Sequence, residues 1–420
     1  MDRRLGQSLL KAGMAMARDP FPFGSMWWNA IEVHSQMKTE LAKKKHQRGP
    51  WITSLLLPFG YGIFWLAGWD PELVERLYAE RVFPPVSRLI SWPARLLPWS
   101  LGELLLILIL AGMVLSLMGF VRGLMARTPD FPWMLLLLKR AGGLFGLAGV
   151  LYASFVLLWG LNYLRPPIAN TLEWPSEPPN VVELQGLCEA LALDANQLRK
   201  ELPSDERGVL RVDRQFVLDR RNDGYERLRG QLMPVLPASM HEPSRPKIAI
   251  FSPLMSRSLT YGMYLPWTGE ALLNGSTPAP ALPFSVCHEM AHQHGIARED
   301  EANFIGYLAC RLHPDPLFRY SGARAVLGEA MAQLWAVAPE AAKAIRASLT
   351  RDVLADEAAE AAWLHLHKGR FSRAQGRVYD GYLKAQGQVD GVRSYGRVVD
   401  LLIAERRMAT KAQRDHKDKN

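Results

Sequence analysis

The stretch FSVCHEMAHQHGIAREDEANF, residues 284–304, determines how the second half of this 420-residue chain is interpreted. It contains three histidines, four acidic residues and one glycine. Two interpretations compete. The stretch is either a metal site that cleaves peptide bonds, or a pair of amphipathic helices whose charged faces are only solvated.

His288, Glu289 and His292 follow the spacing H-E-x-x-H, and Pro283 before them suits the first turn of a helix. Residues i and i+4 lie one turn apart on the same helix face, so both imidazoles can bind one ion while Glu289 reaches a water molecule on it. Such a site needs a third protein ligand and an open fourth position. The spacing therefore predicts a metal site with Glu289 as the general base.

A second helix is expected after Gly295, a residue that can take the left-handed conformation at a helix end. Its E-x-x-A-N pattern puts Glu299 and Asn303 one turn apart, so that Glu299 can be the third ligand while Asn303 supports a ligand histidine. Ala302 is small enough for the two helices to cross closely. Glu301 is the alternative third ligand, and otherwise a supporting residue.

The pair H-E-x-x-H and E-x-x-A-N resembles the gluzincin metallopeptidases, which include thermolysin and the HtpX-like membrane proteases. More narrowly, YLPWTGEALLN, CHEMAHQHGIAREDEANFIGYLAC and GVRSYGRVVDLLIA resemble a bacterial membrane-protein family, DUF3810. This resemblance spans most of the chain and implies a zincin-like metallopeptidase domain that binds Zn²⁺, with no established substrate. His292 and Glu299 are closer in sequence than the corresponding ligands of most gluzincins, which leaves both Glu299 and Glu301 open as the third ligand.

The related metzincin pattern, H-E-x-x-H-x-x-G-x-x-H, fits only as far as Gly295. Its third ligand would fall on Arg298, which stays protonated and is not a zinc ligand. We therefore reject the metzincin pattern.

Three apolar segments precede this region, and each is about long enough to cross roughly 30 Å of hydrocarbon as a helix. They are Trp51–Trp69, Leu101–Val121 and Ala141–Leu164. The first is the weakest because Pro58 and glycines interrupt it. The predicted fold class is therefore an anchor of three transmembrane helices followed by a mainly α, α+β domain with a small β-sheet.

The distribution of Lys and Arg predicts the orientation. Residues 1–50 are rich in both and end in a lysine cluster beside the first apolar segment, which places the N-terminus in the cytoplasm. Three spans then put the C-terminal domain outside the bacterial inner membrane. The net charge of +9 indicates topology and contact with membrane lipids. Nothing in the chain resembles a nucleic-acid-binding motif.

The predicted organisation has five parts, listed here in chain order. They are a basic cytoplasmic extension (1–50), the membrane anchor (51–164), a proline-rich spacer (165–180), the extracytoplasmic domain (181–405) and a charged tail (406–420). Cys188, Cys287 and Cys310 are too few for a disulfide framework, so packed thiols are expected, with Cys287 and Cys310 the pair to test for a bridge.

Strands are expected at Lys247–Phe251 and Tyr261–Thr268. The second could pair with an extended peptide, with Tyr264, Trp267 and Glu270 as substrate-binding residues; a structural turn is the alternative for Glu270.

Tyr395 and Arg397 are candidate donors to the oxyanion of the reaction, unless Tyr395 only packs and Arg397 pairs with Asp400. The predicted function is zinc-dependent hydrolysis of peptides or envelope proteins. The alternative is a non-catalytic metal-binding sensor or scaffold. The oligomeric state is left open.

Overall fold

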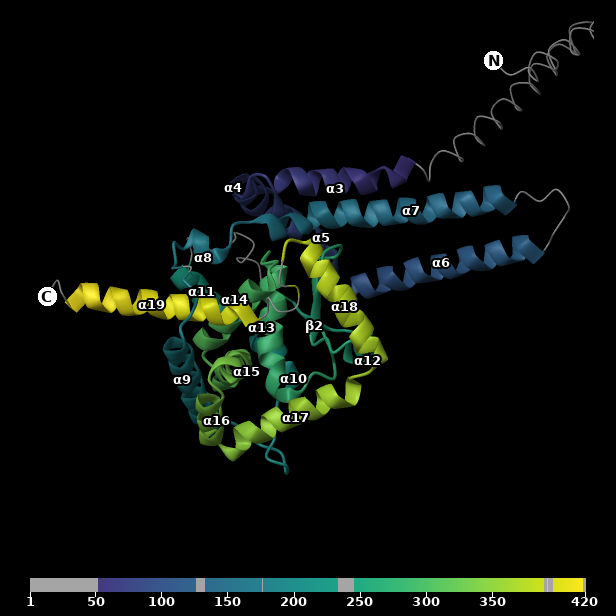
Figure 1. Ribbon diagram of the computed structural model, residues 1–420. Coiled ribbons are helices and arrows are strands. Elements are labelled where there is room, and N and C mark those ends of the chain that lie inside the picture. The colour runs from purple at the N-terminus through teal and green to yellow at the C-terminus, as the bar shows by residue number, and fades with distance from the viewer. Residues whose placement is uncertain are drawn as a thin grey trace, which may run out of the picture. The chain divides into compact units, whose positions relative to one another are not determined.

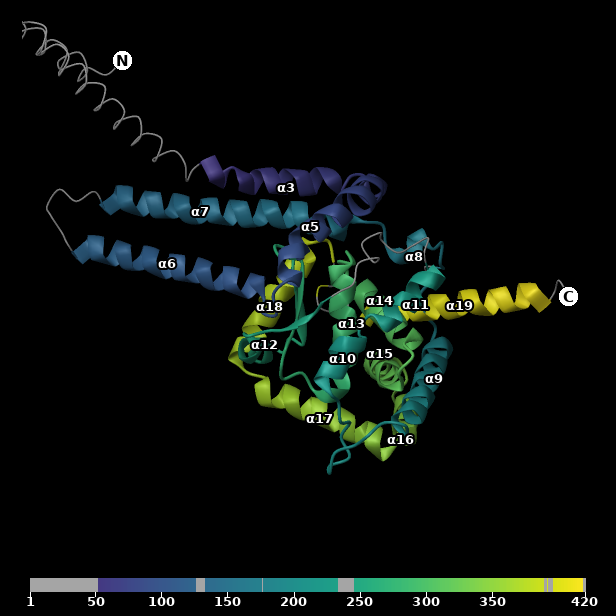
Figure 2. The ribbon, with the colours of Figure 1, turned by 180° about the vertical axis from the view of Figure 1, so that it is seen from behind.

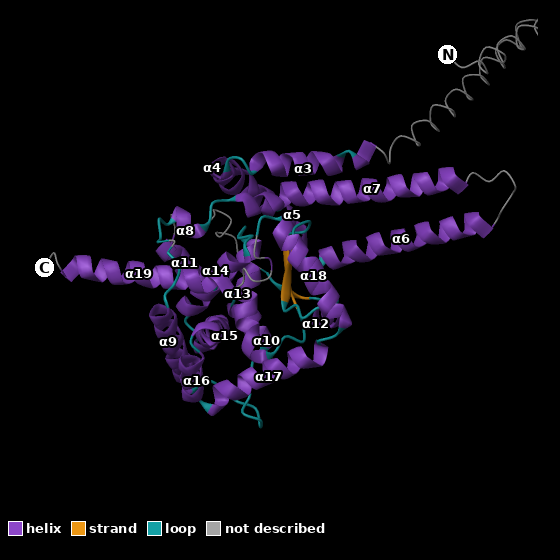
Figure 3. Cartoon of the chain, in the orientation of Figure 1, coloured by secondary structure: helices purple, strands orange, loops and turns teal. Residues whose placement is uncertain are grey.

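The computed structural model describes residues 52–125, 133–175, 177–232, 245–388, 391 and 396–417. The predicted cytoplasmic extension lies outside these residues. The described chain is mainly helical and contains one small sheet, as expected (Figures 1 and 3). It divides into two compact units, of which one comprises residues 60–125 and 153–420 and the other residues 1–59 and 126–152.

Two helices are long and apolar enough to cross a membrane: α6 (Leu101–Met125) and α7 (Trp133–Leu158). The first predicted span, Trp51–Trp69, corresponds to the helical segment Ile52–Ala67, which is followed by a second segment, Pro71–Arg95, bent from it by 104°. The pair counts as a third span only if both parts together cross the bilayer. The described chain therefore has two helices that could span a membrane, or three if the bent pair is one span, whereas the sequence predicts three.

The bent pair contains α3 (Leu56–Ala67), α4 (Pro71–Leu73), a π-helical segment η1 (Val74–Val82) and α5 (Phe83–Arg95). The third predicted span ends earlier than expected, because α7 ends at Leu158. The following 3₁₀ segment, η2 (Gly160–Leu164), is mostly buried. These last residues are therefore part of the core rather than of a membrane helix.

The remaining helices are listed here in chain order. They are α8 (Ile168–Thr171), α9 (Val181–Arg199), α10 (Arg214–Arg220), α11 (Asp223–Leu232), α12 (Ser252–Arg257), η4 (Ala279–Ala281), α13 (Leu282–Gln293), α14 (Glu299–Leu312), α15 (Pro316–Val337), α16 (Pro339–Ser348), α17 (Arg351–His367), α18 (Arg370–Ala385) and α19 (Val398–Lys417).

The sheet has three strands in the order β1-β3-β2. Both predicted strands exist but are shorter than expected, β1 (Lys247–Ile248) and β2 (Gly262–Leu265). Between them lies β3 (Glu270–Leu273), parallel to β1 and antiparallel to β2, which the sequence did not reveal. All four residues of β3 are buried, so it lacks the alternation that marks a half-exposed strand. Strand β2 is an edge of this sheet.

Helix α13 lies in the middle of the domain, among α14, α15 and the sheet, and is buried along nearly its whole length (Figures 1 and 2). The predicted spacer also packs on this domain. Ile168 is buried in the core, and Arg165 forms an ion pair of 2.6 Å with Glu75. The first residues of this segment thus contact the folded domain. The three cysteines are buried free thiols.

Two carboxylates join α6 to the domain, one on strand β3 and one on α6 itself. Glu270 of β3 accepts hydrogen bonds from the backbone of α6, including Gly102 N at 2.7 Å. Glu103 of α6 accepts from Ile250 N and Phe251 N, at 3.0 and 2.8 Å, where α12 begins. Both carboxylates are buried, and each satisfies orphan amides at a helix start. This reciprocal pair of caps fixes the start of α6 to the sheet.

Candidate metal centre

Helices α13 and α14 cross closely because small residues line their contact. Gly295 between them has φ +94°, the left-handed conformation expected of a residue that reverses the chain. Ala302 is fully buried, and a Cβ atom on Gly306 would lie only 3.1 Å from the backbone nitrogen of His288. The crossing brings the first turn of α14 over the histidines of α13.

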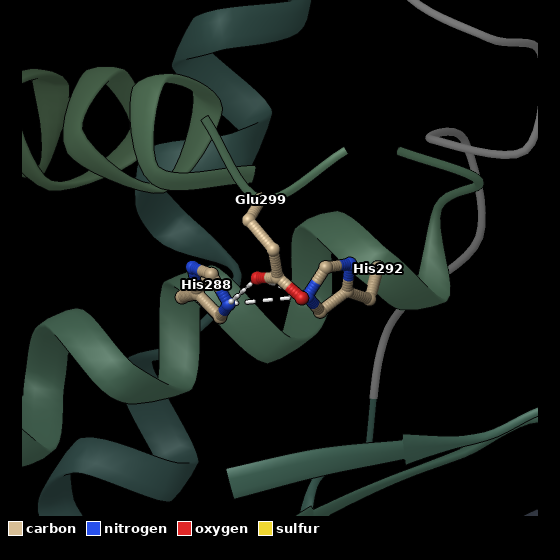
Figure 4. A group of neighbouring side chains, drawn as sticks. All are labelled: His288, His292 and Glu299. Atoms are coloured by element: carbon tan, nitrogen blue, oxygen red, sulfur yellow. Dashed lines mark hydrogen bonds and ion pairs between the residues drawn. The ribbon is translucent and has the colours of Figure 1, made fainter. Parts of the chain in front are cut away.

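His288, His292 and Glu299 converge as a buried group that could hold a metal ion (Figure 4). The two Nε2 atoms are 3.1 Å apart, and each lies 3.4 Å from Glu299 Oε2. Ligand atoms of a tetrahedral zinc site with bonds of roughly 2.0–2.1 Å are separated by about 3.3 Å. The three side chains therefore fit such an ion with little rearrangement.

Neighbouring groups orient two of the ligands. His292 Nδ1 lies 2.7 Å from the carbonyl oxygen of Ile296, which turns Nε2 toward the centre. The Tyr379 hydroxyl donates to Glu299 Oε1 at 2.6 Å, which leaves Oε2 facing the histidines. A hydrogen bond to the second ligand atom is the arrangement that supports metal ligands in proteins.

The charges of the centre are strongly coupled. Burial lowers the pKa of His292, but the Glu299 carboxylate outweighs burial and raises this pKa to about 9. Burial raises the pKa of Glu299, but His292 and His288 outweigh it and hold this pKa far below its ordinary value. A metal ion would therefore compete with a proton for the imidazoles, and its binding should weaken as the pH falls.

The structure distinguishes the two glutamates that the sequence leaves open. Glu301 points away from the histidines and accepts a hydrogen bond of 2.8 Å from Ile168 N. Burial, reinforced by the neighbouring Asp300, raises the pKa of Glu301 to about 7. Of the two, only Glu299 belongs to the group that could hold a metal ion.

Glu289 is buried beside the two histidines, next to strand β2. A Cβ atom on Gly262 of this strand would lie 2.4 Å from Glu289 Cγ, so only glycine leaves room for the carboxylate. Burial raises the pKa of Glu289 to about 6, although His288 and His292 lower it. Its Oε2 has no hydrogen-bond partner within the described part of the chain. A buried carboxylate that titrates near neutral pH is suited to proton transfer.

The residues predicted to bind substrate lie in three different settings. The Tyr264 ring packs 4.6 Å from that of Trp159. Trp267 is 37% exposed and donates to Ser154 Oγ at 3.0 Å. Glu270 is buried, caps α6 as described above, and forms an ion pair of 2.7 Å with Lys247. This carboxylate thus links the sheet to helix α6.

Of the predicted oxyanion donors and supporting residues, the structure describes some and not others. Tyr395 lies outside the described residues. Arg397 is exposed. Burial raises the pKa values of Asp300 and Asp400, and the positive charge of Arg397 partly offsets this rise. Asn303 is buried one turn after Glu299 on α14, as its spacing predicts.

Aromatic residues from distant segments complete the surroundings, and the sequence did not reveal them. The Trp159 ring meets that of His292 edge-on at 6.2 Å. The Tyr163 hydroxyl lies 3.1 Å from that of Tyr382, and the pKa of Tyr382 is raised to about 12 by burial and Glu299, against a lowering by Tyr163. Tyr379 also comes from α18, far along the chain. No spacing rule links these residues to the histidine motif.

A family model described as "Protein of unknown function (DUF3810)" matches residues 78–403. The match begins in η1 and ends in α19, so it includes the candidate centre and the elements around it. No curated protein and no solved structure matches the chain. What the centre does must therefore be argued from its own side chains.

Proposed function

The chain belongs to the DUF3810 family of proteins of unknown function, and we propose that it is a membrane-anchored zinc peptidase with Glu289 as its general base. The observation that carries the proposal is the position of Glu289. It is a buried carboxylate with a pKa near 6, beside a His-His-Glu group of metal-ligand geometry. Structural zinc sites close all four positions with protein ligands, whereas three ligands and a neighbouring base are typical of hydrolytic sites.

His288, His292 and Glu299 would hold the ion, and Tyr379 would keep the Glu299 carboxylate in place. When bound, zinc would supply Lewis acidity that polarises the scissile carbonyl and acidifies a water molecule. Glu289 then accepts the proton of the attacking water and transfers it to the leaving amine. The burial of Glu289 keeps its carboxylate basic enough for this transfer near neutral pH.

A developing oxyanion needs a hydrogen-bond donor that is not itself a ligand. Tyr395 and Arg397 remain proposed for this role. The Tyr382 phenol is a further candidate. Its hydroxyl lies next to that of Tyr163, and the charge of Glu299 raises its pKa.

We propose that the substrate is an extended peptide that pairs with the outer edge of β2, next to Glu289. Tyr264 and Trp267 on and after this strand would contact its side chains. Glu270 is assigned to the α6 cap instead. The site is proposed to face the outside of the bacterial inner membrane, where peptides or envelope proteins are available.

The test compares Glu289→Gln with Glu340→Gln, the same change at an exposed glutamate of α16. The full-length protein, purified in detergent, is analysed for bound metal and for cleavage of a fluorogenic peptide library with zinc present. Glu289→Gln should keep the metal and lose hydrolysis by at least about 100-fold, whereas Glu340→Gln should match the wild type. Metal binding without any cleavage by the wild type would refute the peptidase and favour a metal-binding sensor or scaffold.

A further inference from the structure

Helix α18 exposes two adjacent stripes of different chemistry. Phe371 and Val378, seven residues apart and therefore on one face, are 49% and 74% exposed. Beside them run the exposed residues Arg370, Arg373 and Arg377. Within the described part of the chain these three arginines take part in no ion pair, whereas Lys384 is paired with Asp380 at 2.7 Å. An apolar stripe next to a basic one is typical of helices that lie on a membrane surface.

The C-terminal end of α18 contacts the end of α7. Tyr382 packs with its ring 6.1 Å from that of Phe155, which lies inside the apolar segment Arg140–Leu158 of α7. In both ribbon views α18 lies at the edge of the domain from which α6 departs, and it runs across the direction of α6 (Figures 1 and 2). Helix α18 thus lies next to the start of α6 and the end of α7, the two helices that are long and apolar enough to cross a membrane.

Further exposed apolar side chains occur next to the start of α6. Ile250, bonded through its backbone to Glu103 of α6, is 63% exposed, and Leu254 of α12 is 49% exposed. Trp99, two residues before α6, is 44% exposed, and tryptophans are enriched at the boundary between membrane and water. Exposed apolar side chains gathered beside a helix long enough to cross a membrane are typical of a surface that meets lipid.

We propose that this face is a docking surface for anionic phospholipid, with α18 lying in the headgroup layer. Phe371 and Val378 would enter the boundary between headgroups and acyl chains, and the three arginines would pair with lipid phosphates. The bilayer is the occupant that the structure favours, because the surface is continuous with the helices that enter it. The inference does not depend on peptidase activity.

The experiment places a fluorophore on α18 of the full-length protein in lipid nanodiscs. Val378→Cys is labelled, and Val182→Cys is the matched control. Val182 is a valine that is 80% exposed on α9, on the side of the domain opposite to α6 in both views (Figures 1 and 2). The native cysteines are buried, and the unmodified protein measures their background labelling. Nitroxide-labelled phosphatidylcholine in discs of phosphatidylcholine and phosphatidylglycerol acts as the quencher.

The label at Val378 should be quenched several-fold more than the label at Val182 in anionic discs. Replacing Arg370, Arg373 and Arg377 together by Gln should reduce this quenching to the level seen in purely phosphatidylcholine discs. Equal quenching at Val378 and Val182 in anionic discs would overturn the proposal. So would a triple variant that is quenched like its parent. If the cysteine of Val378→Cys is shielded from labelling in native membranes but not in discs, the surface binds a protein partner instead. This result would also overturn the proposal.

Discussion

Two glutamates separated by one residue show how a single helical step decides between ligand and support. Glu299 and Glu301 are both buried in the first turn of α14, but residues two apart point to nearly opposite sides of a helix. Glu299 meets the imidazoles and Glu301 meets the backbone of Ile168. The sequence alone does not identify which of the two glutamates faces the histidines, because this depends on how α14 is rotated about its axis relative to α13.

The first prediction follows from this difference. Glu299→Ala should reduce the metal affinity by more than about 100-fold, because it removes a ligand and leaves two imidazoles. Glu301→Ala, which removes an equally buried carboxylate outside the group, should retain metal close to the wild-type level. Metal content after dialysis against graded chelator measures both. Retention of metal by Glu299→Ala with loss by Glu301→Ala would reverse the assignment.

The second prediction concerns the dependence of stability on pH at Glu301. Its pKa of about 7 lies above the ordinary value, so the folded state favours the protonated carboxyl group. The stability contributed by this group is fully present below the unfolded pKa, near 4, and is lost as the pH rises through 7. At pH 8 the ionised carboxylate costs on the order of 3–4 kcal/mol in the metal-free protein.

Glu301→Gln should therefore stabilise the metal-free protein at pH 8, by a few degrees in Tm, and leave it nearly unchanged at pH 4.5. The amide oxygen can still accept from Ile168 N. Thermal unfolding of the full-length protein in detergent at both pH values measures the difference, with Glu340→Gln as the exposed control. A Gln variant that is less stable at pH 8 would show that the ionised carboxylate stabilises the fold.

At the scale of elements, the fit between β2 and α13 depends on a missing side chain. The strand runs close enough to Glu289 that Gly262 is in contact with its carboxylate. A third prediction is that Gly262→Ala lowers hydrolysis by at least about 10-fold while metal binding persists, because the new Cβ displaces the base and leaves the ligands in place. Gly328→Ala is the control, since a Cβ there meets nothing within 4 Å. Unchanged hydrolysis would mean that β2 can shift without moving Glu289.

Elements with a local signature were predicted well. The helix carrying H-E-x-x-H, its glycine turn and the helix after it follow from spacings of a few residues, and all three are present. Strand β3 was missed because burial on every side removes the alternation by which strands are recognised. The first predicted span ends at the 104° bend after Ala67, and the π-helical segment η1 follows that bend.

The parts of the site that come from far along the chain could not be predicted. Tyr379 reaches Glu299 across 80 residues, and Glu270 reaches α6 across 168. The sequence marks Glu270 only as an acid after a turn, and its partners become apparent only when α6 is docked. Spacing rules describe one helix or one hairpin, so contacts between such units depend on the whole fold.

For the whole molecule, the fourth prediction concerns topology. If the bent pair Ile52–Ala67 and Pro71–Arg95 is one span, the chain crosses the membrane three times and its ends lie on opposite sides. The basic residues of 1–50 then keep the N-terminus in the cytoplasm. Alkaline phosphatase fused after Asn420 should be active and a fluorescent protein at the same place dark. Fluorescence with no phosphatase activity would place the domain in the cytoplasm.

The contact between Trp159 and His292 has a consequence for which substrates can be reached. Helix α7 ends at Leu158, and the next side chain already packs against a ligand of the candidate centre. Glu103 and Glu270 also hold the start of α6 to the domain through hydrogen bonds. Under the proposed activity, the distance between the membrane surface and the candidate centre would be fixed. The domain would cut polypeptides at a set height above the lipid, and it would choose among substrates by how far they extend from the bilayer as well as by their sequence.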